Sequence, residues 1–155
     1  MRAIDVAGHS CVDEAKCHGE PYYMTEQKRN VYEAIGEKIR PVLKRLNNVS
    51  ADIEASSVMS RDGINLASVM RNNVDQDRLG AMCASLLSLG GKTASELERG
   101  SLKQVLIEGD NGCVLIVQIG DRAVLAVVSK PTSRLGMVFN EARKIAREIE
   151  EAKVL

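Results

Sequence analysis

The sequence predicts an α+β fold in which helices are layered on the faces of a five-stranded antiparallel sheet, in the order αββαβββα. Tight-turn signals separate neighbouring strand-like segments, which favours hairpins and therefore an antiparallel sheet. Two of these segments are almost wholly apolar, which is typical of central strands that are covered on both faces. Three further segments carry apolar residues at steps of three or four, which predicts helices that cover the sheet.

The first helix is predicted to begin at Thr25, whose hydroxyl can cap it, and to end at Asn47 and Asn48. Its apolar stripe consists of Val31, Ile35, Ile39, Val42 and Leu46. Pro41 lies inside this segment and removes one backbone hydrogen bond. Because the stripe stays in phase across Pro41, the sequence favours one kinked helix over two separate helices.

The first two strands are predicted at residues 53–59 and 64–70. The first alternates small or apolar residues with polar ones, which indicates a strand with one exposed face. Between the two strands lies Ser60-Arg61-Asp62-Gly63. An Asp-Gly pair between strand-like runs is a strong signal for a hairpin.

The second helix is predicted to be capped by Asp75 or Asp77 and to continue to Glu98. Small residues form a stripe beside its apolar face: Gly80, Ala84 and Ser88. Such a stripe lets another helix approach closely, or it packs on the protein's own sheet. The adjacent Gly90 and Gly91 are expected to weaken or bend this helix.

Three strands and a helix complete the predicted fold. The strands are expected at residues 103–110, 113–119 and 123–128, and the helix at residues 135–149. Asn111-Gly112, between the first two of these strands, is the signal of a type I′ turn. The strands at 113–119 and 123–128 are the nearly continuous apolar runs, so they are predicted to be central.

Composition limits the function of the chain. Its 155 residues fit one domain, and 21 basic residues balance 21 acidic ones. A nucleic-acid-binding surface usually needs an excess of basic residues, and an aromatic content of 3% offers few bases a stacking platform. No apolar run approaches the ~18 residues of a membrane span. We therefore expect no nucleic-acid partner and no membrane insertion.

Residues 1–23 differ from the rest and are predicted to be a flexible leader before a single domain at 24–155. The leader contains a possible soft-ligand set: His9, Cys11, Cys17 and His18. The C-x5-C spacing departs from that of common zinc sites, so we expect a leader without a metal and a protein without cofactors. Cys83 and Cys113 lie in apolar segments, which is typical of reduced cysteines and indicates a cytoplasmic protein.

The predicted domain lacks the groups that common enzymes use. Residues 24–155 contain no histidine and no G-x-x-x-x-G-K-[ST] loop, so we expect neither general-base catalysis by histidine nor a P-loop GTPase. The chain is accordingly predicted not to be an enzyme. Arg61 and Arg122, each beside an aspartate in a turn, could reach the active site of a partner. The alternative is that they are ordinary solvated turn residues.

Three stretches in this order resemble the Roadblock family, which is named from a dynein light chain. Residues 58–68 resemble the first hairpin of the family, residues 78–90 its central helix rich in small residues, and residues 105–136 its three-strand meander. The resemblance covers roughly residues 40–152. The helix before Pro41 is longer than the family needs, and the leader has no counterpart in it.

The resemblance implies a profilin-like fold and a homodimer formed through the central helix and the strand that follows it. It also implies a role as a scaffold or regulator of a Ras-like small GTPase. The residues expected in the dimer interface are Leu79, Gly80, Met82, Cys83, Leu86, Leu87, Val105 and Ile107. Independently, strand 103–110 is predicted to have a free edge, which proteins normally cover or pair. The sequence does not identify the residues that bind the GTPase.

Two other functions remain open at the level of the sequence. The chain could be a sensor that binds a small molecule between sheet and helix, or a structural subunit of a larger complex without a GTPase. A ligand-sized enclosed cavity with convergent polar groups would favour the sensor. The predicted inward residues are mostly aliphatic, which favours a filled core.

Overall fold

The computed structural model describes residues 26–71 and 75–155. The chain divides into two units, Met1–Val31 and Tyr32–Leu155, and the layers described below belong to the second unit. The predicted leader boundary, the Thr25 cap and the possible ligands of the leader lie outside the described residues. The predicted division into leader and domain therefore stays a prediction.

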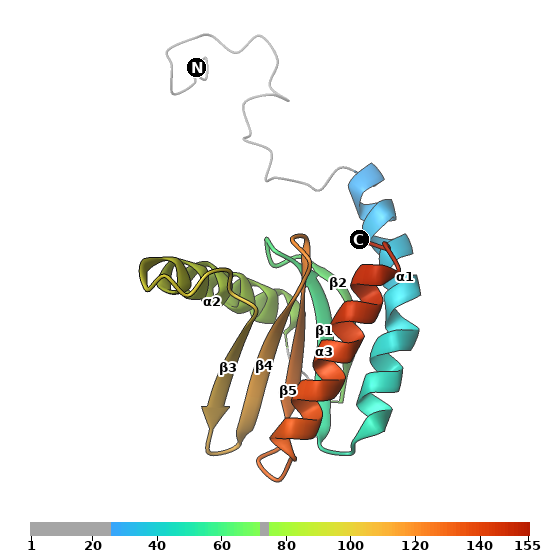
Figure 1. Ribbon diagram of the computed structural model, residues 1–155. Coiled ribbons are helices and arrows are strands. Elements are labelled where there is room, and N and C mark those ends of the chain that lie inside the picture. The colour runs from blue at the N-terminus through green and yellow to red at the C-terminus, as the bar shows by residue number, and fades with distance from the viewer. Residues whose placement is uncertain (1–25, 72–74) are drawn as a thin grey trace, which may run out of the picture. The chain divides into compact units, whose positions relative to one another are not determined.

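The order of helices and strands is αββαβββα, which confirms the predicted fold class. The elements are α1 (Glu26–Val49), β1 (Ile53–Ser60), β2 (Asn65–Met70), α2 (Gln76–Glu96), β3 (Gln104–Gly109), β4 (Gly112–Ile119), β5 (Ala123–Ser129) and α3 (Leu135–Glu151). The five strands form one sheet in the order β2-β1-β5-β4-β3, and every neighbouring pair is antiparallel (Figure 1).

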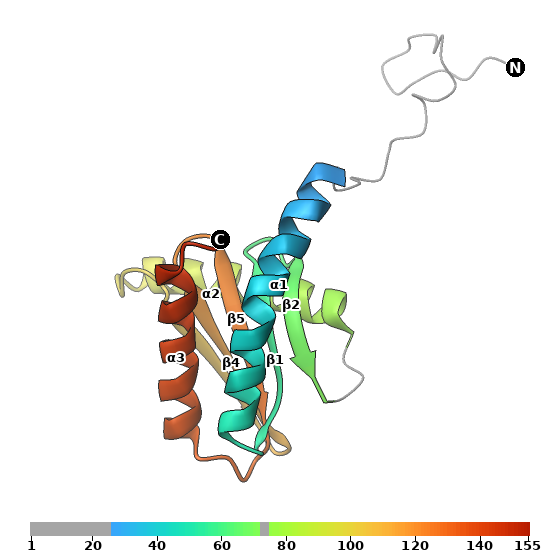
Figure 2. The ribbon, with the colours of Figure 1, turned by 90° about the vertical axis from the view of Figure 1, so that its right-hand side faces the viewer.

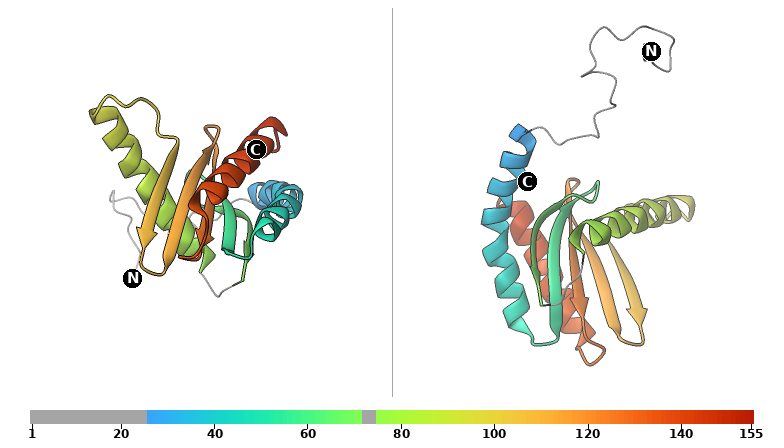
Figure 3. Two further views of the ribbon diagram at one scale, coloured as in Figure 1. Left: turned by 60° about the horizontal axis from the view of Figure 1, so that its bottom comes forward. Right: turned by 180° about the vertical axis from the view of Figure 1, so that it is seen from behind.

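Helices cover the two faces of this sheet unequally. The part of α1 in the second unit and α3 lie side by side on one face, whereas α2 alone crosses the other (Figures 2 and 3). The larger core cluster lies under α1 and α3, and a smaller one lies under α2. β4 and β5 are buried along most of their length, as their apolar sequences predict. Each amphipathic helix thus buries its apolar stripe against one side of a two-sided sheet.

α1 is one helix through Pro41, as predicted. Pro41 is exposed, so water can reach the backbone carbonyl that loses its hydrogen bond. Gly36 allows close packing, because a Cβ atom there would lie 2.3 Å from the carbonyl oxygen of Leu66 in β2. Near the end of the helix, the buried Asn47 donates to the Val69 carbonyl at 3.1 Å and accepts from the Ser56 hydroxyl at 2.6 Å. These contacts fix α1 to the β1–β2 hairpin.

The hairpin turns agree with the sequence at one site and differ at another. Gly63 follows Asp62 with φ +85°, a conformation that favours glycine. The predicted type I′ turn at Asn111-Gly112 is wrong: Gly112 already pairs with Gly109, and Asn111 does not have the positive φ that this turn requires. Glycine is needed at 112 for another reason, since a Cβ atom there would lie 2.1 Å from the Ser129 carbonyl oxygen.

α2 begins after Asp75, whose carboxylate accepts from the backbone N–H groups of Asp77 and Arg78 at 3.1 and 3.2 Å. Of the two predicted caps, Asp75 is therefore the one used. α2 continues through the double glycine to Glu96, close to the predicted end at Glu98. The segment that leads into β3 packs against this part of the helix, where a Cβ atom on Gly90 would lie 3.1 Å from the side chain of Leu102. Tertiary packing thus outweighs the low helix propensity of glycine.

Candidate dimer interface

One side of α2 is committed to the chain's own sheet. Leu79, Cys83 and Leu87 recur at steps of four and are buried in the smaller core cluster. Their partners across the sheet face include Met59, Ile116, Val124 and Ala126. Burial raises the pKa of the Cys83 thiol, because the charged thiolate is disfavoured away from water. This cysteine therefore acts as an apolar core residue and not as a nucleophile.

Gly80 brings the backbone of α2 against the β1–β2 turn. A Cβ atom on Gly80 would lie 2.0 Å from the Gly63 carbonyl oxygen, and one on Gly63 would lie 2.7 Å from the Gly80 carbonyl oxygen. Any side chain at either position would force the two backbones apart. Further along the same stripe, Ala84 and Ser88 line a groove together with this turn. The small-residue stripe thus lets α2 approach its own hairpin.

The other side of α2 exposes large apolar residues. Met82 is 48% exposed and Leu89, seven residues later, is 65% exposed, with the smaller Ala81 and Ser85 also exposed nearby. At the C-terminal end of the helix, Leu97 is 59% exposed. Residues seven apart in a helix lie on the same side, so Met82 and Leu89 belong to one surface. We call Met82, Leu89 and Leu97 the outer face of α2.

β3 forms one edge of the sheet next to this helix (Figure 1). It is the least buried strand: residues 106–109 are all exposed. Val105 and Ile107 pair with Ile116 and Val114, which places them on the α2 side of the sheet. Val105 packs against the smaller core, whereas Ile107 remains 40% exposed. Among the described residues β3 pairs only with β4, so its outer edge is free and adjoins apolar surface on the same side as α2.

The predicted interface residues fall into three groups. Four are buried within the chain: Leu79, Gly80, Cys83 and Leu87. Leu86 and Val105 are half-buried, and Met82 and Ile107 are exposed. Sequence reasoning missed Leu89, although it follows Met82 and Leu86 at the helical spacing of seven and three. The interface itself stays a prediction. Its exposed predicted residues are Met82 and Ile107, and Leu89 is exposed on the same side of α2 as Met82.

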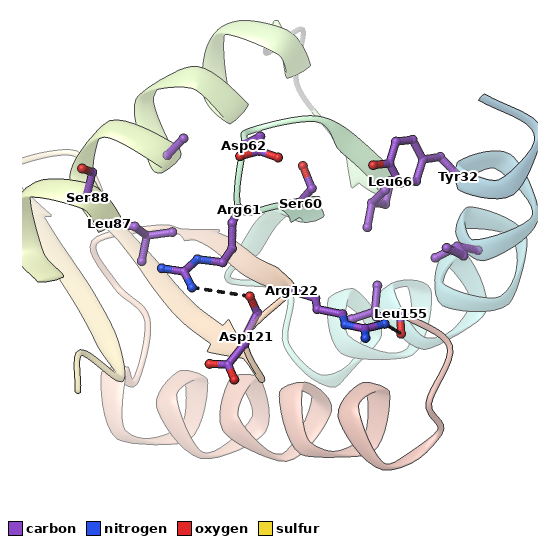
Figure 4. Close-up of a pocket in the computed structure, with 12 residues that line it drawn as sticks. Tyr32, Ser60, Arg61, Asp62, Leu66, Leu87, Ser88, Asp121, Arg122 and Leu155 are labelled. Atoms are coloured by element: carbon purple, nitrogen blue, oxygen red, sulfur yellow. Dashed lines mark hydrogen bonds between the residues drawn. The ribbon is translucent and has the colours of Figure 1, made fainter. Parts of the chain in front are cut away.

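The two Arg-Asp turns meet at one end of the sheet, where they line an open groove of about 720 Å³ (Figure 4). The Arg61 backbone N–H donates to the Arg122 carbonyl at 3.2 Å. The Arg61 guanidinium reaches the Asp121 carbonyl oxygen at 3.5 Å, and that of Arg122 donates to the Leu155 carbonyl oxygen at 3.2 Å. Both arginines are exposed and contact the backbone of their own chain, as ordinary turn residues do.

Other kinds of site find no support in the described part of the chain. Residues 26–71 and 75–155 contain no group of three or more histidine, cysteine or acidic residues that could hold a metal ion. Every helix within those ranges is too short or too polar to span a membrane. The groove beside the Arg-Asp turns is open to solvent and is not an enclosed cavity. The sensor hypothesis thus gains no support from that groove.

Sequence relatives agree with the resemblance noted above. The family model described as Roadblock/LC7 domain matches residues 38–129. An uncharacterised protein of Methanocaldococcus jannaschii, MJ1340, is 32% identical over 109 residues, which cover 70% of this chain and 94% of the relative. A second one from that organism, MJ0714, is 31% identical over 109 residues, which cover 70% of this chain and 91% of the relative.

Solved structures share the fold. Myxococcus xanthus MglB superposes with a TM-score of 0.70 at 22% identity, covering 74% of this chain and 94% of that one. A Roadblock/LC7 domain from Streptomyces avermitilis gives a TM-score of 0.68 at 17% identity, covering 74% and 96%. Acanthamoeba castellanii profilin II gives 0.53 at 15% identity, covering 73% and 97%, which confirms the profilin-like fold. On the family match and the 32% identical relative, this chain belongs to the Roadblock/LC7 domain family, whose members are regulatory or interaction domains.

Proposed function

We propose that this chain is a cytoplasmic homodimeric interaction module that acts as a scaffold or regulator of a Ras-like small GTPase and has no catalytic activity of its own. The observation that supports it most is the combination of an apolar outer face on α2 with the unpaired edge of β3 beside it. No helix or strand within residues 26–71 and 75–155 covers either feature. A second copy covers both at once.

A twofold axis beside β3 satisfies the geometry of both features. Antiparallel pairing of β3 with the β3 strand of a second copy satisfies the free backbone groups of both edges and makes one continuous sheet. The same operation brings the outer faces of the two α2 helices toward each other. Full burial of a Met, Leu or Ile side chain contributes about 1.5–3 kcal/mol, so Met82, Leu89 and Ile107 from each copy supply a substantial driving force.

The GTPase is inferred from the family resemblance and from the chemistry that the chain lacks. Residues 24–155 contain no histidine, and the buried Cys83 is held in its protonated form. Such a protein influences hydrolysis or exchange most simply by ordering the switch loops of a partner that has its own active site. Because Arg61 and Arg122 contact their own backbone, we assign neither of them a direct role in the partner's active site.

The dimer is tested by measuring native mass with light scattering during size exclusion. The monomer has a mass of 16.9 kDa, and we expect the wild-type protein to elute at twice that mass. The double variant Met82→Glu/Leu89→Glu should elute as a folded monomer, because charges on the outer face cannot be buried against each other. Val49→Glu is a matched control, since Val49 is 44% exposed on α1, on the opposite side of the sheet. A monomeric wild-type protein would refute the proposed interface.

The GTPase partner is tested separately, with the immobilised dimer and purified small GTPases from the same organism loaded with GDP or a non-hydrolysable GTP analogue. We expect one GTPase to bind in a manner that depends on its nucleotide state. A dimer that binds none of them in either state would contradict the regulatory role and would favour the structural-subunit alternative. The two experiments are independent, because dimer formation does not require the GTPase.

A further inference from the structure

Leu155 lies in one half of the groove beside the two Arg-Asp turns (Figure 4). Its side chain packs against the larger core cluster, as do those of Tyr32 and Ile35 of α1, which line the same groove. The Arg122 guanidinium donates to the Leu155 carbonyl oxygen at 3.2 Å. This half of the groove thus holds an aliphatic residue by two contacts, an apolar one with its side chain and a hydrogen bond to its backbone oxygen.

The other half of the groove, on the side of α2, offers the same two kinds of contact. Figure 4 shows the Arg61 side chain directed toward α2. There, Leu87 and Ala84 supply apolar surface, and Ser88 is exposed at the rim. A guanidinium next to an aliphatic wall therefore occurs on both sides of the two turns, with Arg61 on one side and Arg122 on the other.

The charge of Arg61 is not neutralised by its own chain. Its guanidinium reaches the Asp121 carbonyl oxygen at 3.5 Å, which is at the outer limit of a hydrogen bond. Arg61 forms no ion pair with a side chain of residues 26–71 and 75–155, and the Asp121 carboxylate points away from its guanidinium (Figure 4). A guanidinium binds a carboxylate through two parallel N–H···O bonds, each about twice as strong as a bond between neutral groups. A carboxylate therefore complements Arg61 better than a backbone carbonyl does.

The two aspartates of the turns limit which acidic ligands fit. The carboxylates of Asp62 and Asp121 line the same groove, so they repel a ligand that carries several acidic side chains. A segment with one carboxylate, directed at Arg61, and with neutral or basic residues elsewhere matches this distribution of charge. The last residue of a chain supplies a carboxylate and a side chain together, which is the pair of groups that Arg61 and Leu87 can contact.

We propose that the Arg61 half of the groove binds the carboxyl-terminal end of a partner protein whose last residue is aliphatic. The terminal carboxylate pairs with Arg61, and the aliphatic side chain packs against Leu87 and Ala84. The groove has a volume of about 720 Å³, and protein ligand sites typically measure about 300–1,000 Å³. Its open form lets the preceding residues of the partner continue into solvent. All of its lining residues belong to one chain, so the inference requires neither the proposed homodimer nor a GTPase.

The probe is a library of seven-residue peptides displayed on phage with free carboxyl ends and selected against the full-length protein. We expect enrichment of Leu, Ile or Val at the last position and depletion of Asp and Glu before it. The best peptide is then synthesised with a free carboxylate and with a carboxyl-terminal amide. The amide should bind at least tenfold more weakly, because it lacks the charge that pairs with Arg61.

Two variants of the protein place the peptide in the groove. Arg61→Ala should weaken binding at least tenfold and remove the difference between the acid and the amide. The fold is retained, because the side chain is exposed and the backbone bond to Arg122 stays. Ser88→Glu puts a carboxylate beside Arg61 and should also weaken binding at least tenfold. Ser95→Glu is the matched control, since Ser95 is exposed two turns further along α2 and does not line the groove.

The inference is overturned if no peptide is selected, if the selected peptides lack an aliphatic last residue, or if acid and amide bind equally. Binding that is indifferent to Arg61→Ala and Ser88→Glu would overturn it too. The double variant Met82→Glu/Leu89→Glu separates this site from the proposed function. It should bind the peptide as tightly as the wild-type protein does, whether or not the wild-type protein is a dimer. Loss of binding in this variant would contradict a site that is complete in one chain.

Discussion

The two faces of the sheet differ in how completely a single chain covers them. Under α1 and α3 lies a large cluster that includes Leu43, Leu46 and Ile149, each at most 2% exposed. Under α2 the cluster is smaller, and its helical members Leu79 and Leu87 remain 7% and 8% exposed. The first face has two helices and a nearly closed core, and the second has one helix with apolar residues on both of its sides.

This difference suggests that the two faces of the sheet have different roles, one in folding and the other in assembly. The hydrophobic effect scales with the apolar area removed from water, so the α1–α3 face supplies most of the stability of one chain. The α2 face contributes less to folding and leaves apolar side chains for contact with other molecules. α2 also packs closely against the β1–β2 turn through Gly80 and Gly63, where an added Cβ atom would clash with the facing backbone. We therefore expect substitutions on the first face to act on stability, and those on the second to act on α2 docking and assembly.

The largest effect is expected from Leu43→Ala. Leu43 of α1 is fully buried in the α1–α3 core, and loss of such a side chain leaves a cavity that lowers the free energy of unfolding by about 2–5 kcal/mol. Leu87→Ala, on the α2 face, should lie at or below the lower end of this range, because Leu87 is 8% exposed. Urea denaturation at one protein concentration measures both values. An equal or larger loss for Leu87→Ala would contradict the view that the α1–α3 face supplies most of the stability of one chain.

Gly80→Ala should separate α2 docking from the helix propensity of α2. The added methyl group meets the Gly63 carbonyl at 2.0 Å, so we expect a loss of about 1–3 kcal/mol in the free energy of unfolding. Gly91→Ala is the matched control in the same helix, since a Cβ atom there has no neighbour within 4 Å. It should gain about 0.5–1 kcal/mol from reduced backbone entropy. If both variants change stability in the same direction, the close contact at Gly80 does not control docking.

A smaller effect is expected at the start of α2. Asp75→Ala removes the side-chain acceptor of two backbone N–H groups and should lower the free energy of unfolding by about 1 kcal/mol. Asp75→Asn keeps an acceptor oxygen and should recover most of that loss. Thermal unfolding monitored by circular dichroism measures both variants. Equal losses for the two substitutions would show that the charge, and not the cap geometry, is important.

The smallest effect is a pH dependence from Cys83. Burial raises its thiol pKa in the folded state above the ordinary 9.0, so the folded protein holds this proton more tightly than the unfolded chain. The stabilising contribution is complete below pH 9.0 and is lost as the pH rises from there through the folded-state pKa. Cys83→Ala should abolish this decline. Urea denaturation between pH 8 and 10 tests it, and an identical pH dependence in both proteins would contradict it.

The sequence predicted the order of elements and the buried strands β4 and β5, because periodicity and turn residues are local signals. It was wrong about β1, which was expected to have one exposed face and is buried along most of its length between β2 and β5. It predicted one helix across Pro41, since the apolar stripe kept its phase. It failed at Asn111-Gly112, where local rules expect a type I′ turn, and it did not show what supports the helix at Gly90-Gly91. In both cases a distant segment decides: Leu102 packs on Gly90, and the Ser129 carbonyl excludes a side chain at Gly112.

The candidate interface shows the same limit. Helical periodicity placed an apolar set on one side of α2: Leu79, Met82, Cys83, Leu86 and Leu87. Of these, Leu79, Cys83 and Leu87 are buried together in the core. Periodicity does not say whether that side faces the chain's own sheet or a second copy. The structure assigns it to the sheet and leaves Met82 and Leu89 outside. Leu89 could have been found from its spacing to Met82.

The sequence by itself determined the fold class, the family and the absence of histidine from residues 24–155, because these depend on composition and on patterns along the chain. Only the tertiary structure decided which apolar residues remain exposed, since exposure depends on what other segments cover. The tertiary structure also shows why Gly36, Gly63 and Gly80 must be glycines, because each lies against a backbone segment that is distant in sequence. Close approach between distant segments is a property of packing, which no local pattern encodes.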